Sequence, residues 1–340
     1  MTTSNQQRAV AWWLFACCAM VFLTMVVGGV TRLTHSGLSI VEWKPLIGAL
    51  PPLSHADWLE LFAKYQQTPE FIQRNHDMTL DGFQFIFWWE WAHRLSGRFI
   101  GVVFLLPYMY FLFRGYLKGA LAGKVFGFFI LGGLQGAMGW YMVKSGLVDD
   151  PRVSQYRLAA HLGLAFLLFG LMWWTGLGML QARSATAGSP ATRKLGNTLV
   201  ALVFIMVLSG ALVAGIRAGL AYNTFPLMNG HFLPPESFVV EPWWLNFFTN
   251  MATVQFDHRL IAWLLMGLIP WYSRRIWNEV PAARTPAMVL TLWLAVQVTL
   301  GIATLLLKVP VALGAAHQAG AMVLFGILLW TNHASRRSYS

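Results

Sequence analysis

The sequence predicts an all-α membrane protein with eight transmembrane helices, arranged as two duplicated antiparallel four-helix bundles. Two observations lead to this fold class. The first is composition: 57% of the 340 residues are hydrophobic, 11% are charged, and the mean hydropathy is +0.55, whereas a soluble domain carries about 25% charged residues. The second is an internal repeat, because four motifs of the first half recur in the same order in the second half.

Eight apolar stretches are long enough for transmembrane helices, which need ~20 residues. They cover residues 11–31, 83–113, 121–143, 156–180, 195–217, 247–273, 286–307 and 311–333. No clear processing site follows the first stretch, so we expect neither a cleavable signal peptide nor a transit peptide. Cys17 and Cys18 lie inside it and are expected to be small packing residues, not a disulfide framework or a haem attachment site.

The repeat is carried by four pairs of segments. They are SGLSIVEWKPLIGALPP (36–52) with AGLAYNTFPLMNGHFLPP (218–235), EWAHRLSGRFIG (90–101) with QFDHRLIAWLLM (255–266), GLQGAMG (133–139) with AVQVTLG (295–301), and YRLAAHLGLAFLLFG (156–170) with ALGAAHQAGAMVLFG (312–326). We therefore divide the chain into an N-terminal half (1–180), a cytoplasmic linker (181–194) and a C-terminal half (195–340). Each half holds an even number of spans, so both halves have the same orientation, as in parallel repeats.

The distribution of charge predicts the membrane topology. If the N-terminus is inside, the inner segments hold twelve basic residues against one acid, Glu279, and the outer loops hold nine basic residues against ten acids. This is the positive-inside bias, and it places both termini in the cytoplasm. The net charge of +11 is thus explained by topology and does not indicate nucleic-acid binding. A bacterial plasma membrane is the simplest location.

Two outer loops are longer than plain connections. Residues 32–80 contain SHADWLELFAKY, which predicts a helix from Ser54 with an apolar face, expected at the outer membrane interface. The loop 218–246, rich in proline and aromatic residues, is expected to cover the second half in a similar way.

Four histidines lie at matching depths in the repeat: His93, His161, His258 and His317. They fall on the second and fourth spans of each half. From each histidine to the inner end of its span is roughly 14–20 residues, about 21–30 Å as a helix. All four are therefore expected in the outer third of the membrane.

Two neutral imidazoles approaching from facing helices of a bundle are the axial ligands of a b-type haem. The alternative is that each histidine is only a polar contact between helices, but two equivalent pairs favour haem iron as the bound metal. Zinc is a weaker competitor, because it prefers four ligands and no cysteine or carboxylate set accompanies either pair. The remaining histidines are expected to be ordinary surface residues: His35, His55, His76, His231 and His333.

Three arginines lie near these histidines. Arg94 and Arg259 directly follow His93 and His258, so they project about 100° away around the helix. They are candidates either for snorkelling toward lipid headgroups or for pairing with haem propionates. Arg98 adds a cation near the first site only, because its aligned position is Trp263.

The halves differ chemically at one position, where Glu90 aligns with Gln255. Glu90 is three residues before His93, so both lie on one helix face with Cβ atoms about 5–6 Å apart. A carboxylate beside the rim of a haem could exchange protons, which makes Glu90 the candidate catalytic residue. The alternative is a structural ion pair with Arg94 or Arg98.

These residues carry a resemblance to a known family. EWAHRLSGR with His161, and DHRL with His317, set in duplicated four-helix halves, resemble the haem A synthases, membrane oxidoreductases that convert haem O to haem A. The resemblance extends over essentially the whole chain, including TRLTHSGLSIVEWKPLIGALPPL in the first outer loop.

The resemblance implies that a porphyrin methyl group of haem O is oxidised to formyl by successive hydroxylations, through a geminal diol that loses water, to supply haem A for terminal oxidase assembly. It implies that Glu90 is the essential glutamate, that His93 and His161 hold the substrate haem, and that His258 and His317 hold a retained haem b. Some relatives carry a cysteine pair in the first outer loop. This chain has none there, so it is more similar to the mitochondrial and proteobacterial branch.

The rival interpretation is a di-haem b electron-transfer cytochrome, and a third is a haem carrier. A transmembrane relay needs redox centres near both faces, whereas these histidines share one face, and a carrier does not explain the difference between Glu90 and Gln255. No nucleotide or flavin fingerprint occurs, so electrons come from a separate donor. The sequence leaves open that donor, the oxygen source, a homo-oligomeric state, and whether haem O synthase delivers the substrate.

Overall fold

The computed structural model describes residues 5–42, 47–146, 151, 153–180 and 186–336, and its regular structure is helical. The one isolated bridge in this part joins Met228 and His231. The all-α class predicted from the sequence is therefore confirmed. Trp43 and Lys44 of the first outer loop, and residues 181–185 of the predicted linker, lie outside the described residues.

Eight helices of 23 to 34 residues form the body of the described protein. They are α1 (Asn5–Leu33), α4 (Leu80–Phe113), α5 (Gly119–Gly146), α6 (Gln155–Leu180), α7 (Pro190–Gly215), α10 (Met251–Glu279), α11 (Arg284–Leu306) and α12 (Val311–Ala334). The last five residues of the predicted linker, 190–194, belong to α7, whose first turn is capped by the Ser189 side chain. The linker is therefore shorter than the sequence indicated.

Seven of these helices are long and apolar enough to cross a membrane, which makes this a multi-pass membrane protein. The remaining long helix, α10, is long enough but is not among the seven. Its apolar run is interrupted by Asp257 and Arg259 near one end and by Arg274 and Arg275 near the other. The eighth span thus remains a prediction.

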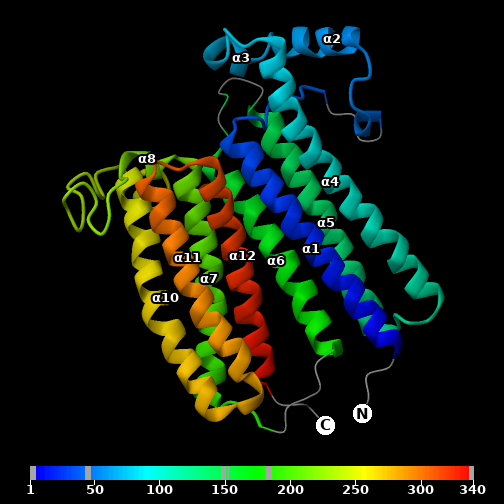
Figure 1. The fold of residues 1–340 in the computed structure, drawn as a ribbon, viewed down its shortest axis with the longest axis vertical. Helices are drawn as coiled ribbons and strands as arrows, with labels where there is room; N and C mark the ends of the chain where they lie inside the picture. The colour runs from blue at the N-terminus through cyan, green and yellow to red at the C-terminus, as the bar shows by residue number, and fades with distance from the viewer. Residues whose placement is uncertain (1–4, 43–46, 147–150, 152, 181–185, 337–340) are drawn as a thin grey trace.

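The short helices lie mostly at one end of the bundle, opposite the chain termini (Figure 1). They are η1 (Ile47–Ala49), α2 (His55–Tyr65), α3 (Pro69–Arg74), α8 (Ala218–Ala221), η2 (Trp243–Leu245) and α9 (Asn246–Thr249), whereas η3 (Pro281–Ala283) joins α10 to α11. We call the end with α2, α3 and α8 the loop end, and the end with the termini the terminal end.

The long helices pack as two four-membered rings. In the first ring, α1 contacts α4 and α6, and α5 contacts the same two helices, so α4 and α6 face each other diagonally. In the second ring, α7 contacts α10 and α12, and α11 contacts the same two, so α10 and α12 are diagonal. The order of contacts in each ring is the order that two duplicated bundles predict.

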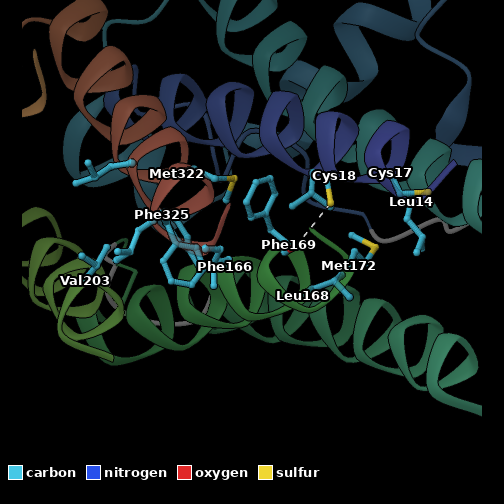
Figure 2. Close-up of a cluster of buried hydrophobic side chains, with 14 of the residues drawn as sticks. Leu14, Cys17, Cys18, Phe166, Leu168, Phe169, Met172, Val203, Met322 and Phe325 are labelled. Carbon is cyan, nitrogen blue, oxygen red and sulfur yellow. Dashed lines mark hydrogen bonds between the residues drawn. The ribbon is translucent and has the colours of Figure 1, made fainter. Parts of the chain in front are cut away.

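The rings meet through α6 and α12, with α1 against α12 on one side and α6 against α7 on the other. Figure 2 shows the buried side chains of this interface, including Phe166 and Phe169 from α6 and Phe325 from α12. Cys17 and Cys18 are buried here as free thiols, as predicted, and Cys18 Sγ donates to the Phe169 carbonyl at 3.6 Å.

The helix predicted from Ser54 is confirmed as α2. Ser54 Oγ accepts from the Asp57 amide at 3.1 Å, and Asp57 Oδ2 accepts from the Ser54 amide at 3.0 Å, which is a capping box. Its apolar face packs on the first turns of α4, at the loop end, where the Trp58 and Phe87 ring centroids lie 4.9 Å apart. The helix therefore forms part of a protein core rather than resting only on a membrane interface.

A buried carboxyl group lies beneath this loop region. Glu70 in α3 is 4% exposed, and its Oε2 lies 3.5 Å from the Tyr65 hydroxyl. Burial, together with the smaller effect of the charge of Glu90, raises the pKa of Glu70 to about 7. The folded protein thus prefers protonated Glu70.

This preference predicts a pH-dependent stability. The stabilising contribution of protonated Glu70 is complete below its unfolded pKa near 4.5 and is lost as pH rises through about 7. The difference of about 2.5 units corresponds to at most about 3 kcal/mol. Thermal unfolding in detergent should therefore show a stability loss between pH 5 and pH 8 that Glu70→Gln reduces. Glu60→Gln, at an exposed position of α2, serves as the control, and an unchanged pH slope in Glu70→Gln would contradict the assignment.

Candidate functional site

The four predicted histidines lie near the loop end on the diagonal helices of the two rings. His93 is on α4 and His161 on α6, whereas His258 is on α10 and His317 on α12. Each is six to thirteen residues from the loop end of its helix. All four side chains are half-buried.

The two histidines of each predicted pair lie on helices of the same four-membered ring. His93 is near enough to His161 to act on it electrostatically, and the same is true of His317 and His258. Each pair thus joins two diagonal helices of one ring. Two imidazoles that approach from opposite sides of a four-helix bundle are suited to axial ligation of a haem iron.

A glycine of the neighbouring helix lies against each imidazole. A Cβ atom on Gly28 would lie 2.6 Å from Cε1 of His93, and one on Gly139 would lie 3.1 Å from Cε1 of His161. The second ring repeats the arrangement: Gly210 would meet His258 at 3.2 Å and Gly301 would meet His317 at 2.8 Å. Because these glycines have no side chain, each imidazole ring fits against the neighbouring helix. Any larger residue at the glycine position would displace the imidazole.

The imidazoles on α4 and α10 are oriented through Nδ1. His93 Nδ1 lies 3.2 Å from the Thr24 carbonyl, and His258 Nδ1 lies 3.3 Å from the Ser209 hydroxyl. A carbonyl can only accept, so Nδ1 of His93 carries the proton and its Nε2 has the lone pair. A ring N–H that donates to a carbonyl while the other nitrogen remains basic is the usual arrangement of a metal-binding histidine.

Equivalent glutamines hold the histidines on α6 and α12. Gln135 Nε2 donates to the His161 carbonyl at 3.1 Å, and Gln297 Nε2 donates to the His317 carbonyl at 2.9 Å. The same amide nitrogens lie 3.4 Å from Nε2 of His161 and 3.2 Å from Nδ1 of His317. These contacts link α5 to α6 and α11 to α12 at the depth of the rings.

Glu90 is a buried, fully engaged carboxylate that is 2% exposed. Its Oε1 accepts from Arg94 Nε at 3.0 Å and Nη2 at 2.6 Å. Its Oε2 accepts from the Ser39 hydroxyl at 2.7 Å and the Ile40 amide at 2.8 Å. The ion pair with Arg94, weighed above as the alternative, is therefore present, and it fixes the carboxylate one helical turn from His93.

Arg94 and Arg259 both fasten the loop region above their ring. Arg94 donates to the carbonyls of Ile40 at 2.9 Å and Glu42 at 3.4 Å. Arg259 donates to the carbonyls at the two aligned loop positions, Tyr222 at 3.1 Å and Thr224 at 2.8 Å. These guanidinium groups therefore connect a long helix of each bundle to the loop region beside it.

Gln255 takes the place of Glu90 in the second ring. Its Nε2 donates to the Tyr222 carbonyl at 2.7 Å, whereas Glu90 accepts from the amide of the aligned Ile40. Gln255 Oε1 and Arg259 Nε are buried without a hydrogen-bond partner among the described residues. The loop is thus fastened in both rings, but a carboxylate is present in only one.

The other polar residues that the sequence singled out lie around these pairs. Arg98 is half-buried one turn further along α4, where the charge of Arg94 acts on it. Asp257, the neighbour of His258 in the sequence, lines an apolar cavity of 350 Å³ between α7 and α10 that is also lined by Ser209, the partner of His258 Nδ1. Within the described ranges, no group of three or more histidine, cysteine or acidic residues is placed to hold a metal ion, so a zinc site of that kind is not formed there.

Most of the remaining histidines agree with the expectation of surface positions, but one does not. His35 and His55 are exposed in the loop region, as are His76 and His231. His333 instead is half-buried near the terminal end, where its ring packs 4.8 Å from that of Trp174. That histidine is therefore part of a helix–helix contact.

Sequence reasoning missed the glycine and glutamine partners of the histidines. Gln135 with Gln297 and Gly139 with Gly301 served only as markers of the repeat. Their recurrence in both halves, on the helix that directly precedes each of the histidines His161 and His317, was the signal that could have found them. A glycine repeated at the depth of a histidine, on the helix beside it, indicates a close approach of ring and backbone.

Comparison with known proteins adds an independent finding. The profile of a family described as cytochrome oxidase assembly protein, COX15-CtaA, matches residues 11–329. The heme A synthase of Nitrosospira multiformis is 59% identical over 336 residues, 97% of this chain and 94% of that protein. Those of Nitrosomonas eutropha (53% identical, 96% and 94%) and Parvibaculum lavamentivorans (48% identical, 97% and 95%) are also similar over nearly their full length.

The glycine contacts generate a prediction about both pairs. Gly28→Ala and Gly301→Ala should displace the rings of His93 and His317, because the new Cβ atoms would lie 2.6 and 2.8 Å from them. We expect each variant to lose the haem of its own ring, measured by extraction and absorption spectroscopy of the purified protein. Gly133→Ala on α5, where a Cβ meets nothing within 4 Å, is the control and should retain both. Full haem content in the first two variants would refute the proposed contact geometry.

Proposed function

The chain belongs to the cytochrome oxidase assembly family COX15-CtaA, and on that premise we propose that it is a haem A synthase, a membrane oxidoreductase that converts haem O to haem A. The reaction oxidises a methyl group on the porphyrin edge to formyl by successive hydroxylations. The observation that carries the proposal is the pair of matching histidine sites with a buried carboxylate, Glu90, in only one of them.

The two sites have different roles in this proposal. His93 and His161 bind the iron of the substrate haem O, and His258 with His317 bind a retained haem b. The pairing of diagonal helices, the glycine beside each ring and the orientation of Nδ1 in His93 and His258 support iron ligation. At His161 the Gln135 amide must give up its 3.4 Å contact with Nε2, which is long for a hydrogen bond. The retained haem would supply one-electron redox chemistry.

Glu90 is the catalytic group of the proposal. Removing hydrogen from a methyl carbon releases protons and develops positive charge on the porphyrin edge, which a fixed carboxylate can accept or stabilise. Four donors hold Glu90 in place, so its position does not depend on the substrate. Gln255 supplies an amide of similar shape in the ring that does not react.

The membrane arrangement follows from the charge distribution. We place the terminal end in the bacterial cytoplasm and the loop end outside, because the basic residues gather at the terminal end. In this arrangement α10 is the eighth span, and its Asp257 and Arg259 lie near the outer interface. The matched contacts of the two rings support two duplicated bundles. The haem sites then lie toward the outer face, where the loops cover them.

A di-haem b electron-transfer cytochrome is the second candidate, because two bis-histidine sites alone would suit it. All four histidines lie near the loop end, however, and a relay across the membrane needs a centre near each face. The enzyme proposed here would receive its electrons from a separate donor protein and its haem O from haem O synthase. A homo-oligomer is compatible with both.

The two sites predict different effects of histidine replacement. His258→Ala and His317→Ala should each remove the retained haem b, because a single remaining imidazole cannot complete bis-histidine ligation. His93→Ala and His161→Ala should keep haem b and lose bound haem O and haem A. Haem extraction with mass identification measures all four variants. His76→Ala, at an exposed loop position, is the control. Stoichiometric haem b in both His258→Ala and His317→Ala would assign the retained haem elsewhere.

Glu90→Gln should preserve the fold and both haem sites but reduce haem A formation by about 10²–10⁴-fold, the range for loss of a general base. Haem O or a hydroxylated intermediate should remain bound. The measurement is the haem composition of membranes over time.

Arg94→Gln separates catalysis from structure. It removes the partner of Glu90 and keeps the carboxylate, so a purely structural ion pair predicts equal losses in Glu90→Gln and Arg94→Gln. A catalytic carboxylate predicts a clearly larger loss in Glu90→Gln. Glu279→Gln, which breaks the similar pair with Arg275 at the terminal end, is the control for ion pairs in general.

A further inference from the structure

A cavity of 510 Å³ lies between α6, α7 and α12 in the terminal half of the protein. Its walls are apolar and include Leu171, Phe204, Phe325 and Leu329. Leu167 and Ala201 at its sides are exposed, so the cavity opens sideways, toward the space that lipid occupies around a membrane protein. Figure 2 shows Phe325 in the adjoining core beside Phe166 and Val203. We call this cavity the α6/α7/α12 groove.

The end of the groove nearest the termini is polar. Asn332 is 2% exposed, and its Nδ2 donates to Asn197 Oδ1 at 3.1 Å. Arg336 Nη2 donates to the same oxygen at 2.5 Å and its guanidinium lies 4.8 Å from the centroid of the Trp174 ring. Asn332 Oδ1 is buried without a partner among the described residues. The Tyr272 hydroxyl, also without a partner among the described residues, lies near this oxygen, since a Cβ atom on Gly196 would lie 2.8 Å from both. The polar end of the groove is therefore formed by Asn197, Asn332 and Arg336.

The charge at this end is positive. Arg336 is exposed, and its two contacts, the Asn197 amide and the Trp174 ring, are neutral. Arg193 and Lys194 lie at the same end of the protein, on the first turns of α7. The nearest acid on α10, Glu279, accepts hydrogen bonds from Arg275 and from the start of α7. An anionic group is therefore favoured beside Arg336.

The repeat makes the groove informative, because the matching interface on the other side is closed. Aligning the two halves on Gly28 with Gly210 and on Gly170 with Gly326 pairs three groove residues with three others. The pairs are Asn197 with Phe15, Leu329 with Trp173, and Asn332 with Gly176.

On that other side, Phe15 and Trp173 fill the corresponding space. Their ring centroids lie 4.8 Å apart, and a Cβ atom on Gly176 would lie 2.8 Å from the Phe15 ring. The Trp173 indole also donates to the Gly326 carbonyl at 3.0 Å. The same helix geometry thus produces a packed interface on one side and an open groove with a polar end on the other, so the opening does not follow from helix packing alone.

We infer that the α6/α7/α12 groove binds one anionic phospholipid of the leaflet at the terminal end, with an acyl chain along the apolar walls and the headgroup beside Arg336, Asn197 and Asn332. Basic pockets between helices on the cytoplasmic side of membrane proteins suit anionic headgroups. The phosphate of phosphatidylglycerol would pair with the exposed guanidinium of Arg336, which lines the groove. The lipid would fill the contact between the two rings that the chain itself leaves open.

The position of the groove favours a lipid over a redox ligand. From His161 to Trp174 along α6 is thirteen residues, which is about 20 Å in a helix. From His317 to Asn332 along α12 is fifteen residues, or about 22 Å. A ligand at the polar end is therefore far from both histidine pairs, and this inference stands independently of the proposed function.

The test is native mass spectrometry of the full-length protein, purified in mild detergent and titrated with phosphatidylglycerol or phosphatidylcholine of the same acyl chains. The wild type should retain one phosphatidylglycerol in preference to phosphatidylcholine. Arg336→Gln should reduce that preference about fivefold, the effect of one basic residue near a headgroup. Arg284→Gln is the matched control, because Arg284 also lies at the terminal end over a tryptophan, Trp277, and does not line the groove.

A second variant tests the groove itself. The double substitution Asn197→Phe with Leu329→Trp fills the groove with two of the aromatic side chains of the closed side and should abolish retention of the single lipid, while an unchanged haem content shows that both helix bundles remain folded. Equal binding of both lipids by the wild type, or an unchanged preference in Arg336→Gln, overturns the inference. If the double variant changes the oligomeric state and leaves lipid retention unchanged, the groove is covered by a second copy of the chain instead.

Discussion

Each functional histidine is positioned by close contact with a glycine on the neighbouring helix. The four contacts, Gly28 with His93, Gly139 with His161, Gly210 with His258 and Gly301 with His317, occur at the same depth in both rings. Side chains in a packed bundle occupy almost all the available volume, so a bulky ring can enter only where its neighbour has no side chain. The spacing of the helices, the orientation of the imidazole rings and the placement of the histidines on diagonal helices all depend on these four missing Cβ atoms.

One arginine in each four-helix ring connects the loops of the loop end to the long helices by hydrogen bonds. A guanidinium inside an apolar bundle must be fully hydrogen-bonded, since an unsatisfied charge there costs several kcal/mol. Arg94 and Arg259 meet most of this requirement with carbonyls at aligned positions of the two loops, whereas Arg259 Nε is buried without a partner among the described residues. The same contacts hold the loops over the ends of the bundles at which the histidine pairs lie. The hydrogen bonds from arginine to the loop carbonyls therefore both stabilise the buried charge and position the loop over the histidine pair. The two bundles differ chiefly in the residue beside this arginine, which is a carboxylate, Glu90, in the first and an amide, Gln255, in the second.

The duplication also shows how two copies of one helix arrangement acquire different surfaces. At the contact between the rings, Phe15 and Trp173 fill one side, whereas Asn197 and Leu329 leave the other side open. The backbone contacts are matched, so the difference arises from a few side-chain volumes. Near the loop end a single side chain likewise distinguishes the two bundles, because the carboxylate of Glu90 is replaced by the amide of Gln255. The two bundles thus differ locally, while the order of contacts between their helices is the same.

The sequence by itself determined the all-α class, the approximate positions of the long helices, the capped helix from Ser54 and the family, because these depend on local apolar periodicity, capping residues and contiguous motifs. It also indicated the four histidines and Glu90, since polar groups are conspicuous in apolar stretches. Only the tertiary structure decided what those groups touch. Arg94 reaches Ile40 across 54 positions, and Gly28 meets His93 across 65, and such distant contacts depend on how whole helices pack. For the same reason the shorter linker, the packing of α2 on α4 and the open groove at Asn332 emerged only when the helices were placed in space.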